Sequence, residues 1–211
     1  MFEMTMGVEG MGGWRVIING HQVEAKHAQF VHDKYGRVVL GLRPEGFIGW
    51  AFFEPGGGGS VSIPFTKSPD GELLIALIKE NRANMGGSRW CAIGGYLTPG
   101  DTHQKTAERE TEEEAGLVVS KPVSLPGLPG CINRATQVAN PDEDEGVHGF
   151  AIEIPWGLIE KTEEGYKMAP GTISHKRESE MRFFHWKDAI RLTADMLARG
   201  AISQLLAELL P

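Results

Sequence analysis

The segment GGYLTPGDTHQKTAERETEEEAGL, residues 94–117, constrains the fold more than any other part of this chain. Pro99 and Gly100 favour a turn, and either Asp101 or Thr102 can cap a helix that follows it. Gly116 is placed to end that helix in a left-handed conformation. The segment therefore predicts a turn, a helix over 102–115 and a sharp stop. Small residues at every fourth position predict one closely packed helix face: His103, Ala107, Thr111 and Ala115.

Acidic side chains crowd one side of the same predicted helix. Glu110, Glu113 and Glu114 stand at i, i+3 and i+4, so their carboxylates converge, and each like-charge pair costs about 0.2–0.5 kcal/mol on an exposed helix. Arg109 can pair with Glu112 or Glu113, but one cation cannot offset four glutamates. A hard divalent cation among the carboxylates would explain the cluster, since Mg²⁺ prefers oxygen ligands. The alternative is an acidic helix face in contact with solvent only.

The spacing of the segment resembles the signature of the Nudix hydrolases, Gly-x5-Glu-x7-Arg-Glu-U-x-Glu-Glu-x-Gly-U, where U is a bulky aliphatic residue. Two positions depart from the signature. Asp101 stands where the family has Glu and is one methylene shorter, and Thr111 stands where an aliphatic residue is usual. The signature positions are occupied here by Gly95, Asp101, Arg109, Glu110, Thr111, Glu113, Glu114, Gly116 and Leu117.

The resemblance implies a fold and a chemistry. The fold is of the α+β (mixed α/β) class, an α/β/α sandwich with a mixed β-sheet, here with an N-terminal β extension. The activity is hydrolysis of a nucleoside diphosphate linked to another moiety, with Mg²⁺ or Mn²⁺. Carried over to this chain, Glu110, Glu113 and Glu114 bind the metal together with the Gly94 carbonyl. Arg109 orients the glutamates, and Glu113 is also a catalytic candidate.

Beyond the signature, the chain resembles the ADP-ribose pyrophosphatase branch of that family. Members carry an N-terminal β extension that commonly swaps across a homodimer, which residues 14–55 match. The stretch IALIKENR ends in Arg82, where the branch has an arginine that contacts substrate, and Gly95 is a second substrate-binding candidate. The resemblance implies ADP-ribose, or a related nucleotide-sugar, as the substrate and AMP and ribose 5-phosphate as the products.

Further site residues follow from the same resemblance. Leu128-Pro129-Gly130 occupies the place of a proline turn in the branch, so Pro129 is expected to bind substrate, and Arg134 could meet a phosphate. A loop glutamate beyond the signature often acts as the base, and Glu178 and Glu180 are the candidates. The alternatives are a Nudix hydrolase of dinucleoside polyphosphates, NADH or oxidised nucleoside triphosphates, and a non-catalytic nucleotide sensor.

Hydrophobic patterning predicts the organisation of the chain. We expect a lead-in at 1–13, a β extension at 14–59 and the Nudix domain at 60–211. Asn19-Gly20 predicts a hairpin turn, and the glycines at 56–59 predict a joint that is neither helix nor a good strand. Long loops are expected at 120–147 and 156–179. Strands are expected at 14–19, 37–42, 47–53, 60–65, 72–80, 90–93, 117–119, 148–154 and 180–186, with 21–32 extended, and helices at 187–198 and 201–210.

Charge and cysteine usage limit the partners and the compartment. The 21 Lys and Arg against 28 Asp and Glu give a net charge of −7, which argues against nonspecific binding to nucleic acid. No run of 18 apolar residues occurs, so no membrane association is expected, and the N-terminus lacks the pattern of a signal peptide. The 2 cysteines form no CxxC pair. A cytoplasmic protein is therefore expected, and the resemblance implies that its partner is a small molecule linked to a nucleoside diphosphate.

Overall fold

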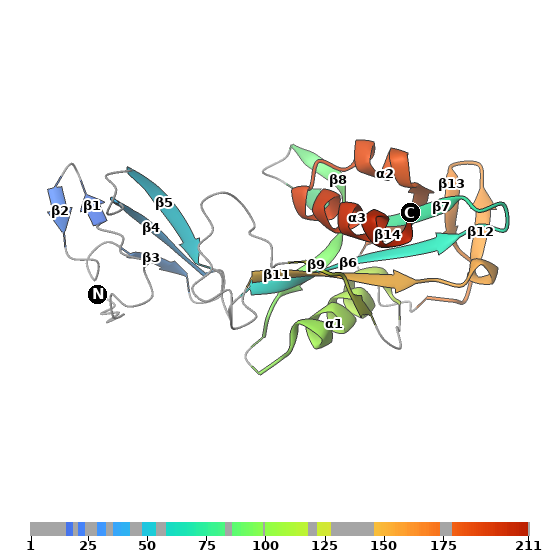
Figure 1. The fold of residues 1–211 in the computed structure, drawn as a ribbon, viewed down its shortest axis with the longest axis horizontal. Coiled ribbons are helices and arrows are strands. Elements are labelled where there is room, and N and C mark those ends of the chain that lie inside the picture. Colours follow the sequence, from blue (N-terminus) through green and yellow to red (C-terminus); the bar gives the residue numbers. More distant parts are fainter. Residues whose placement is uncertain are drawn as a thin grey trace. The chain divides into compact units, whose positions relative to one another are not determined.

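A computed structural model of the chain describes residues 16–18, 21–23, 29–32, 36–42, 48–53, 58–82, 86–98, 100–117, 122–127, 146–173 and 179–210 (Figure 1). The chain forms two compact units, Met1–Gly58 with Cys131–Gly146, and Gly59–Gly130 with Val147–Pro211. The predicted lead-in at 1–13 lies outside the described residues, and the predicted division into domains stays a prediction. Within the described residues, no helix is long and apolar enough to cross a membrane.

The first unit is built from short antiparallel strands. The pair Ile18↔His21 leaves Asn19 and Gly20 between the first two strands, in the place where the sequence predicts a hairpin. A second sheet pairs its three strands in chain order, as sequential antiparallel strands commonly do. The strands are β1 (Val16–Ile18), β2 (His21–Val23), β3 (Gln29–His32), β4 (Gly36–Leu42) and β5 (Ile48–Phe53).

The second unit is organised around a nine-stranded sheet. Its main path runs β10-β11-β6-β7-β14-β13-β12, with β8 paired to β7 and β9 paired to β6. The strands are β6 (Gly58–Lys67), β7 (Leu73–Arg82), β8 (Gly87–Cys91), β9 (Ile93–Tyr96), β10 (Val123–Ser124), β11 (Gly146–Glu153), β12 (Ile159–Thr162), β13 (Gly165–Met168) and β14 (Glu180–His185). The helices are α1 (His103–Ala115), α2 (Trp186–Leu192) and α3 (Met196–Leu209), with a 3-10 turn η6 (Trp156–Leu158).

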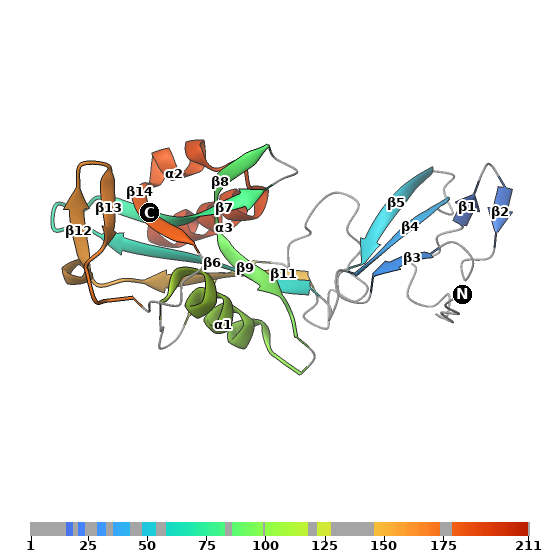
Figure 2. The same ribbon diagram turned by 180° about the vertical axis from the view of Figure 1, so that it is seen from behind.

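Helices cover both faces of this sheet. Residues 73–78 of β7 are all apolar. Since successive side chains point to opposite faces of the sheet, this part of the strand is apolar on both sides. Leu73, Ile75 and Leu77 pack with the residues of α2 and α3, whereas Leu74, Ala76 and Ile78 pack with the end of α1. Figure 2 shows α1 on one side of the sheet and α2 with α3 on the other. The predicted α/β/α sandwich is confirmed.

The prediction that residues 56–59 cannot form a good strand is wrong for Gly58 and Gly59, which open β6. A Cβ on Gly59 would lie 2.5 Å from the Gly95 carbonyl oxygen, and one on Gly58 would lie 1.9 Å from the oxygen of Gly146. These glycines allow neighbouring backbones to approach closely within the sheet, which is a recognised use of glycine in strands.

Two further predictions need correction. The stretch 156–179 is not one long loop, because the hairpin of β12 and β13 lies in it, with four residue pairs in register. The break between the last two helices falls at residues 193–195 and not at Gly200. Asp195 accepts a hydrogen bond from the N–H of Leu197 at 2.9 Å and so caps α3. Gly200 lies inside α3, where a glycine is tolerated at a modest cost.

The contrast between the two kinds of glycine gives a stability prediction. Gly59→Ala should lower the free energy of unfolding by about 1–3 kcal/mol, since the added methyl group meets backbone that cannot move aside easily. Gly200→Ala, with no atom within 4 Å of its new Cβ, should raise it by about 0.5–1 kcal/mol. Urea unfolding of both variants measures these changes. Equal effects at the two positions would contradict the close approach of β6 and β9.

Candidate active site

Helix α1 begins and ends as its sequence predicts. The Thr102 hydroxyl accepts a hydrogen bond from the N–H of Lys105 at 3.2 Å, so Thr102 rather than Asp101 is the cap. Gly116 ends the helix with φ 71°, and its N–H donates to the Glu112 carbonyl at 2.9 Å. Thr111, the departure from the signature, is fully buried and donates its hydroxyl to the Ala107 carbonyl at 2.6 Å. The hydroxyl is thus satisfied inside the helix.

Two glycines of β9 let carboxylates of α1 reach the strand backbone. The N–H of Gly94 donates to Glu114 Oε2 at 3.1 Å. A Cβ on Gly95 would lie 2.0 Å from Glu110 Oε1, so any other residue at this position would displace that carboxylate. A larger residue at position 94 would also clash with β6, because its Cβ would lie 2.5 Å from the Ser60 carbonyl oxygen.

Arg109 ties the carboxylates of α1 to the turn before the helix. Its Nη1 donates to Glu110 Oε1 at 2.6 Å and to Glu113 Oε2 at 3.3 Å. Its Nη2 donates to the Tyr96 carbonyl at 3.3 Å and lies 3.4 Å from the Thr98 hydroxyl. Of the two partners predicted for Arg109, Glu113 is therefore found. The shorter Asp101 still approaches, with Oδ2 at 3.9 Å from Nε.

A fourth carboxylate, which the sequence analysis missed, belongs to this group. Glu80 lies in β7 two residues after Ile78, so alternation places it on the face that α1 covers. Burial raises the pKa of Glu114 to about 8, with the negative charge of Glu80 as the second cause and that of Glu110 as a weaker one. The Gly94 N–H and the charge of Arg82 act in the opposite direction. The period-two continuation of the buried strand could have revealed Glu80.

The donor set fits a hard divalent cation. Carboxylate and carbonyl oxygens are the ligands that Mg²⁺ and Mn²⁺ prefer. A cation among them would offset the charges of Glu80 and Glu110, which add to the effect of burial in raising the pKa of Glu114. Among the described residues, no three acidic, histidine or cysteine side chains are already gathered as a metal cage. Sharing a cation therefore requires side-chain rotation, chiefly of Glu113, whose side chain is 55% exposed.

The other predicted residues fall into two groups. Glu178, Pro129 and Arg134 lie outside the described residues. Glu180 is described, and its carboxylate accepts a hydrogen bond from Nε of Arg182, whose Nη2 lies 2.5 Å from Glu164 Oε2. The N–H of the preceding residue, Ser179, donates to the Glu114 carbonyl at 3.1 Å. The start of β14 is thereby linked to the end of α1.

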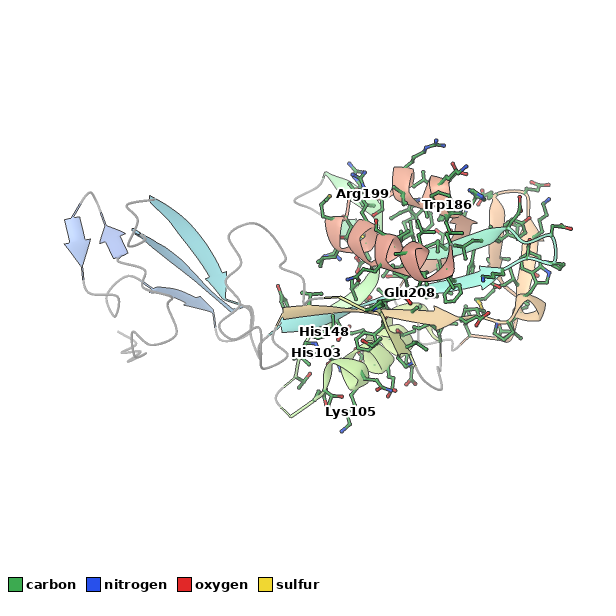
Figure 3. The ribbon with its side chains drawn as sticks, in the orientation of Figure 1. His103, Lys105, His148, Trp186, Arg199 and Glu208 are labelled. Atoms are coloured by element: carbon green, nitrogen blue, oxygen red, sulfur yellow. The ribbon has the colours of Figure 1, made fainter. Side chains whose placement is uncertain are left out.

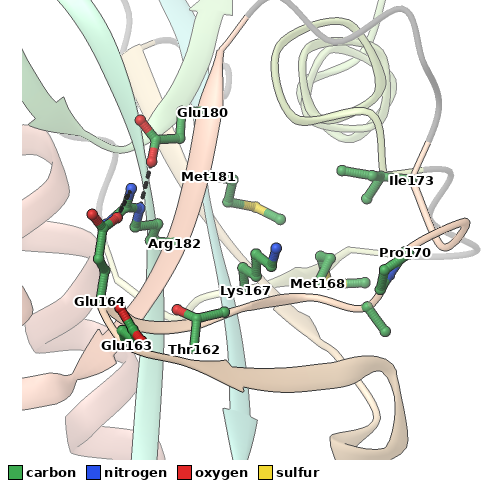
Figure 4. A pocket seen from close by; sticks show the side chains of 11 residues that line it. Thr162, Glu163, Glu164, Lys167, Met168, Pro170, Ile173, Glu180, Met181 and Arg182 are labelled. Carbon is green, nitrogen blue, oxygen red and sulfur yellow. Dashed lines mark hydrogen bonds and ion pairs between the residues drawn. The ribbon is translucent and has the colours of Figure 1, made fainter.

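Glu180 and Arg182 line a pocket of about 720 Å³ between β14 and the hairpin of β12 and β13 (Figure 4). Met168 and Met181 contribute apolar surface to it. Among the described residues, none from α1, β7 or β9 lines this pocket, so it is separate from the carboxylates around Gly94.

Figure 3 shows Lys105 on α1, far from Trp186 of α2, with the sheet between them.

The Glu114 environment predicts a pH-dependent effect on stability. A pKa raised above its ordinary value makes the metal-free fold lose stability as pH rises from about 4.5 to about 8. Glu114→Gln removes this charge, and its amide oxygen can still accept from Gly94. In a chelator, the variant should equal the wild type near pH 5 and exceed it by about 1–2 kcal/mol near pH 8.5. Urea unfolding at both pH values measures this, and a variant less stable at high pH would contradict it.

Comparison with known proteins gives a domain family and several similar solved structures. The model of the NUDIX domain matches residues 56–203. A solved structure described as an ADP compounds hydrolase is 12% identical, with a TM-score of 0.50, and the match covers 86% of this chain and 90% of that one. A mutT/nudix family protein from Listeria innocua is 21% identical, with a TM-score of 0.49 and coverages of 74% and 94%. An Ap4A hydrolase from C. elegans is 14% identical, with a TM-score of 0.47 and coverages of 72% and 97%.

No curated protein matches the chain in sequence. At 12% identity, the likeness to the ADP compounds hydrolase supports the fold and nothing finer. The domain match, by contrast, spans more than two thirds of the chain and includes the whole signature segment. The chain therefore belongs to the Nudix family.

Proposed function

We propose that this protein hydrolyses the pyrophosphate bond of a nucleoside diphosphate linked to another moiety, and that its substrate is ADP-ribose or a related nucleotide-sugar. The observation that carries the proposal is the placement of Glu110 and Glu114 against the backbone of Gly94 and Gly95. This arrangement gathers hard oxygen donors beside a strand end. The products from ADP-ribose would be AMP and ribose 5-phosphate.

The residues around Gly94 supply a metal site in this proposal. Glu110, Glu113, Glu114 and the Gly94 carbonyl would hold Mg²⁺ or Mn²⁺. Bound there, the cation supplies the positive charge that neutralises phosphate oxygens and lowers the pKa of the attacking water. Arg109 holds Glu110 and Glu113 in place from the side of the helix, through hydrogen bonds of 2.6 and 3.3 Å.

The remaining catalytic roles belong to residues around this group. Arg82 adds a cation on the substrate side, where a phosphate needs a hydrogen-bond donor. A carboxylate oxygen of Glu178 would take the proton from the attacking water. Glu180, the other candidate, pairs with Arg182 in the separate pocket and would have to leave that contact to act as the base. The hydrogen bond from the Ser179 N–H to the Glu114 carbonyl holds Ser179 beside the end of α1, which supports a base close to Ser179 in the chain. Pro129 and Arg134 stay proposed substrate contacts.

The β-rich N-terminal part supports the choice of branch. Strands β1 to β5 precede the Nudix domain, as the β extension does in the ADP-ribose pyrophosphatase branch. We propose that residues 14–59 join two copies of the chain into a homodimer, and that the protein acts in the cytoplasm. Light scattering of the purified protein at the dimer mass would support the first point, and the monomer mass would contradict it.

The proposed activity predicts a specific outcome in a substrate panel. With Mg²⁺, the protein should convert ADP-ribose to AMP and ribose 5-phosphate faster than it hydrolyses dinucleoside polyphosphate, NADH or an oxidised nucleoside triphosphate. Chromatography of the products measures this. A strong preference for another panel member would overturn the branch assignment and keep the Nudix chemistry. No turnover of any member would favour the nucleotide-sensing alternative.

The same panel tests the metal glutamates. Glu113→Gln keeps the side-chain volume and removes a charge, so kcat should fall by about two orders of magnitude or more. Glu112→Gln is the matched control, because Glu112 is exposed on the same helix and occupies a variable position of the signature. Its kcat should equal that of the wild type. Wild-type turnover in Glu113→Gln would remove that residue from the metal site.

A further inference from the structure

Glu80 and Arg82 form an ion pair at the end of β7. Their side chains share one face of the strand because they stand two residues apart. Glu80 Oε2 lies 2.5 Å from Nη2 of Arg82. The Glu80 side chain is 18% exposed, whereas that of Arg82 is 45% exposed. The carboxylate is therefore the fixed member of the pair, and the guanidinium is the member that can meet a ligand.

The strand register places the pair on the face of the sheet that α1 covers. Glu80 and Arg82 follow Ile78 at two-residue steps, so their side chains leave the strand on the same side as the Ile78 side chain. Ile78 packs in the core cluster that includes Ala115 at the end of α1. Cys91 of β8, which is buried, stands opposite Ile78 in the register of the two strands.

The pair lies close to the carboxylates of α1. The charge of Glu80 raises the pKa of Glu114 and the charge of Arg82 lowers it, so both side chains act on the carboxylate that the Gly94 N–H holds. The ion pair with Glu80 leaves further N–H donors on the guanidinium, since arginine has more donors than this contact uses. A phosphate beside the carboxylates would find those donors oriented in advance.

We propose that Glu80 is a positioning residue, which holds the Arg82 guanidinium so that its remaining N–H donors bind a phosphate of the substrate. The inference rests on the proposed function and adds to it a residue outside the signature. Arginine binds phosphate through a planar fork whose orientation matters, unlike the point charge of lysine. Without Glu80, Arg82 keeps its charge and loses its orientation.

The test is a double-mutant cycle on the full-length protein at saturating Mg²⁺, with the panel substrate that is turned over best. Glu80→Gln should raise KM about tenfold, the loss expected for one charge-assisted hydrogen bond, and should change kcat by less than about threefold. Arg82→Lys should raise KM by a similar factor. The double variant should be no worse than either single one, because both changes remove the same contact. Glu153→Gln, at the exposed end of β11, is the matched control and should leave KM unchanged.

A binding measurement separates positioning from other roles. Methylenediphosphonate, which cannot be hydrolysed, should bind the Mg²⁺-loaded Glu80→Gln variant about tenfold more weakly than the wild type by calorimetry. If Glu80→Gln does not fold, Glu80→Asp takes its place in the cycle, since it keeps the charge with a shorter reach. It is expected to give a smaller rise in KM.

The possible results distinguish a failure of the positioning role of Glu80 from a failure of the proposed function. Unchanged KM and unchanged diphosphonate affinity in folded Glu80 variants, with an active wild type, would overturn this inference alone. Weaker Mn²⁺ binding in Glu80→Gln, with unchanged KM at saturating metal, would instead make Glu80 a metal ligand and overturn its positioning role. A wild type that turns over no panel member would overturn the proposed function and this inference with it.

Discussion

The close contact between α1 and β9 is the constraint on which the site depends. Glu110 occupies the space where a side chain at position 95 would stand, and Glu114 accepts the N–H of Gly94. The contact requires small residues on the face of α1 that meets the sheet, and glycines at two successive positions of β9. The caps fix where α1 begins and ends, and the burial of β7 on both faces fixes the sheet against which α1 packs.

The negative charges gathered in this region lower the stability of the fold when no cation is bound. Burial raises the pKa of Glu114 to about 8, and the charges of Glu80 and Glu110 add to the rise, so ionising all three carboxylates costs free energy. Two arginines offset part of the charge, Arg109 from the helix and Arg82 from β7. A fold seldom keeps such a concentration of like charge without a use. Binding a divalent cation would use the carboxylates, and binding the phosphates that accompany it would use the arginines.

Features of the fold that depend on neighbouring residues could be predicted from the sequence, and contacts between distant segments could not. The caps of α1, the carboxylates at i, i+3 and i+4 and the Asn19-Gly20 hairpin depend on residues close in the chain. The place of Glu80 beside Glu114 depends on how β7 meets α1, which no local pattern reports. The places of Gly59 and Gly200 in the fold also depend on distant residues, so the sequence pattern predicts them wrongly. Gly59 serves a contact with β9, and Gly200 sits in α3 because Asp195 caps the helix earlier.

The carboxylates beside Gly94 are proposed to bind the catalytic cation. A crystal soaked in Mn²⁺ tests this most directly, because the anomalous signal locates the ion without reference to activity. We expect a peak within coordination distance of Glu114, of at least one of Glu110 and Glu113, and of the Gly94 carbonyl. A protein that diffracts well and shows its only manganese elsewhere, with these carboxylates unchanged, would contradict it.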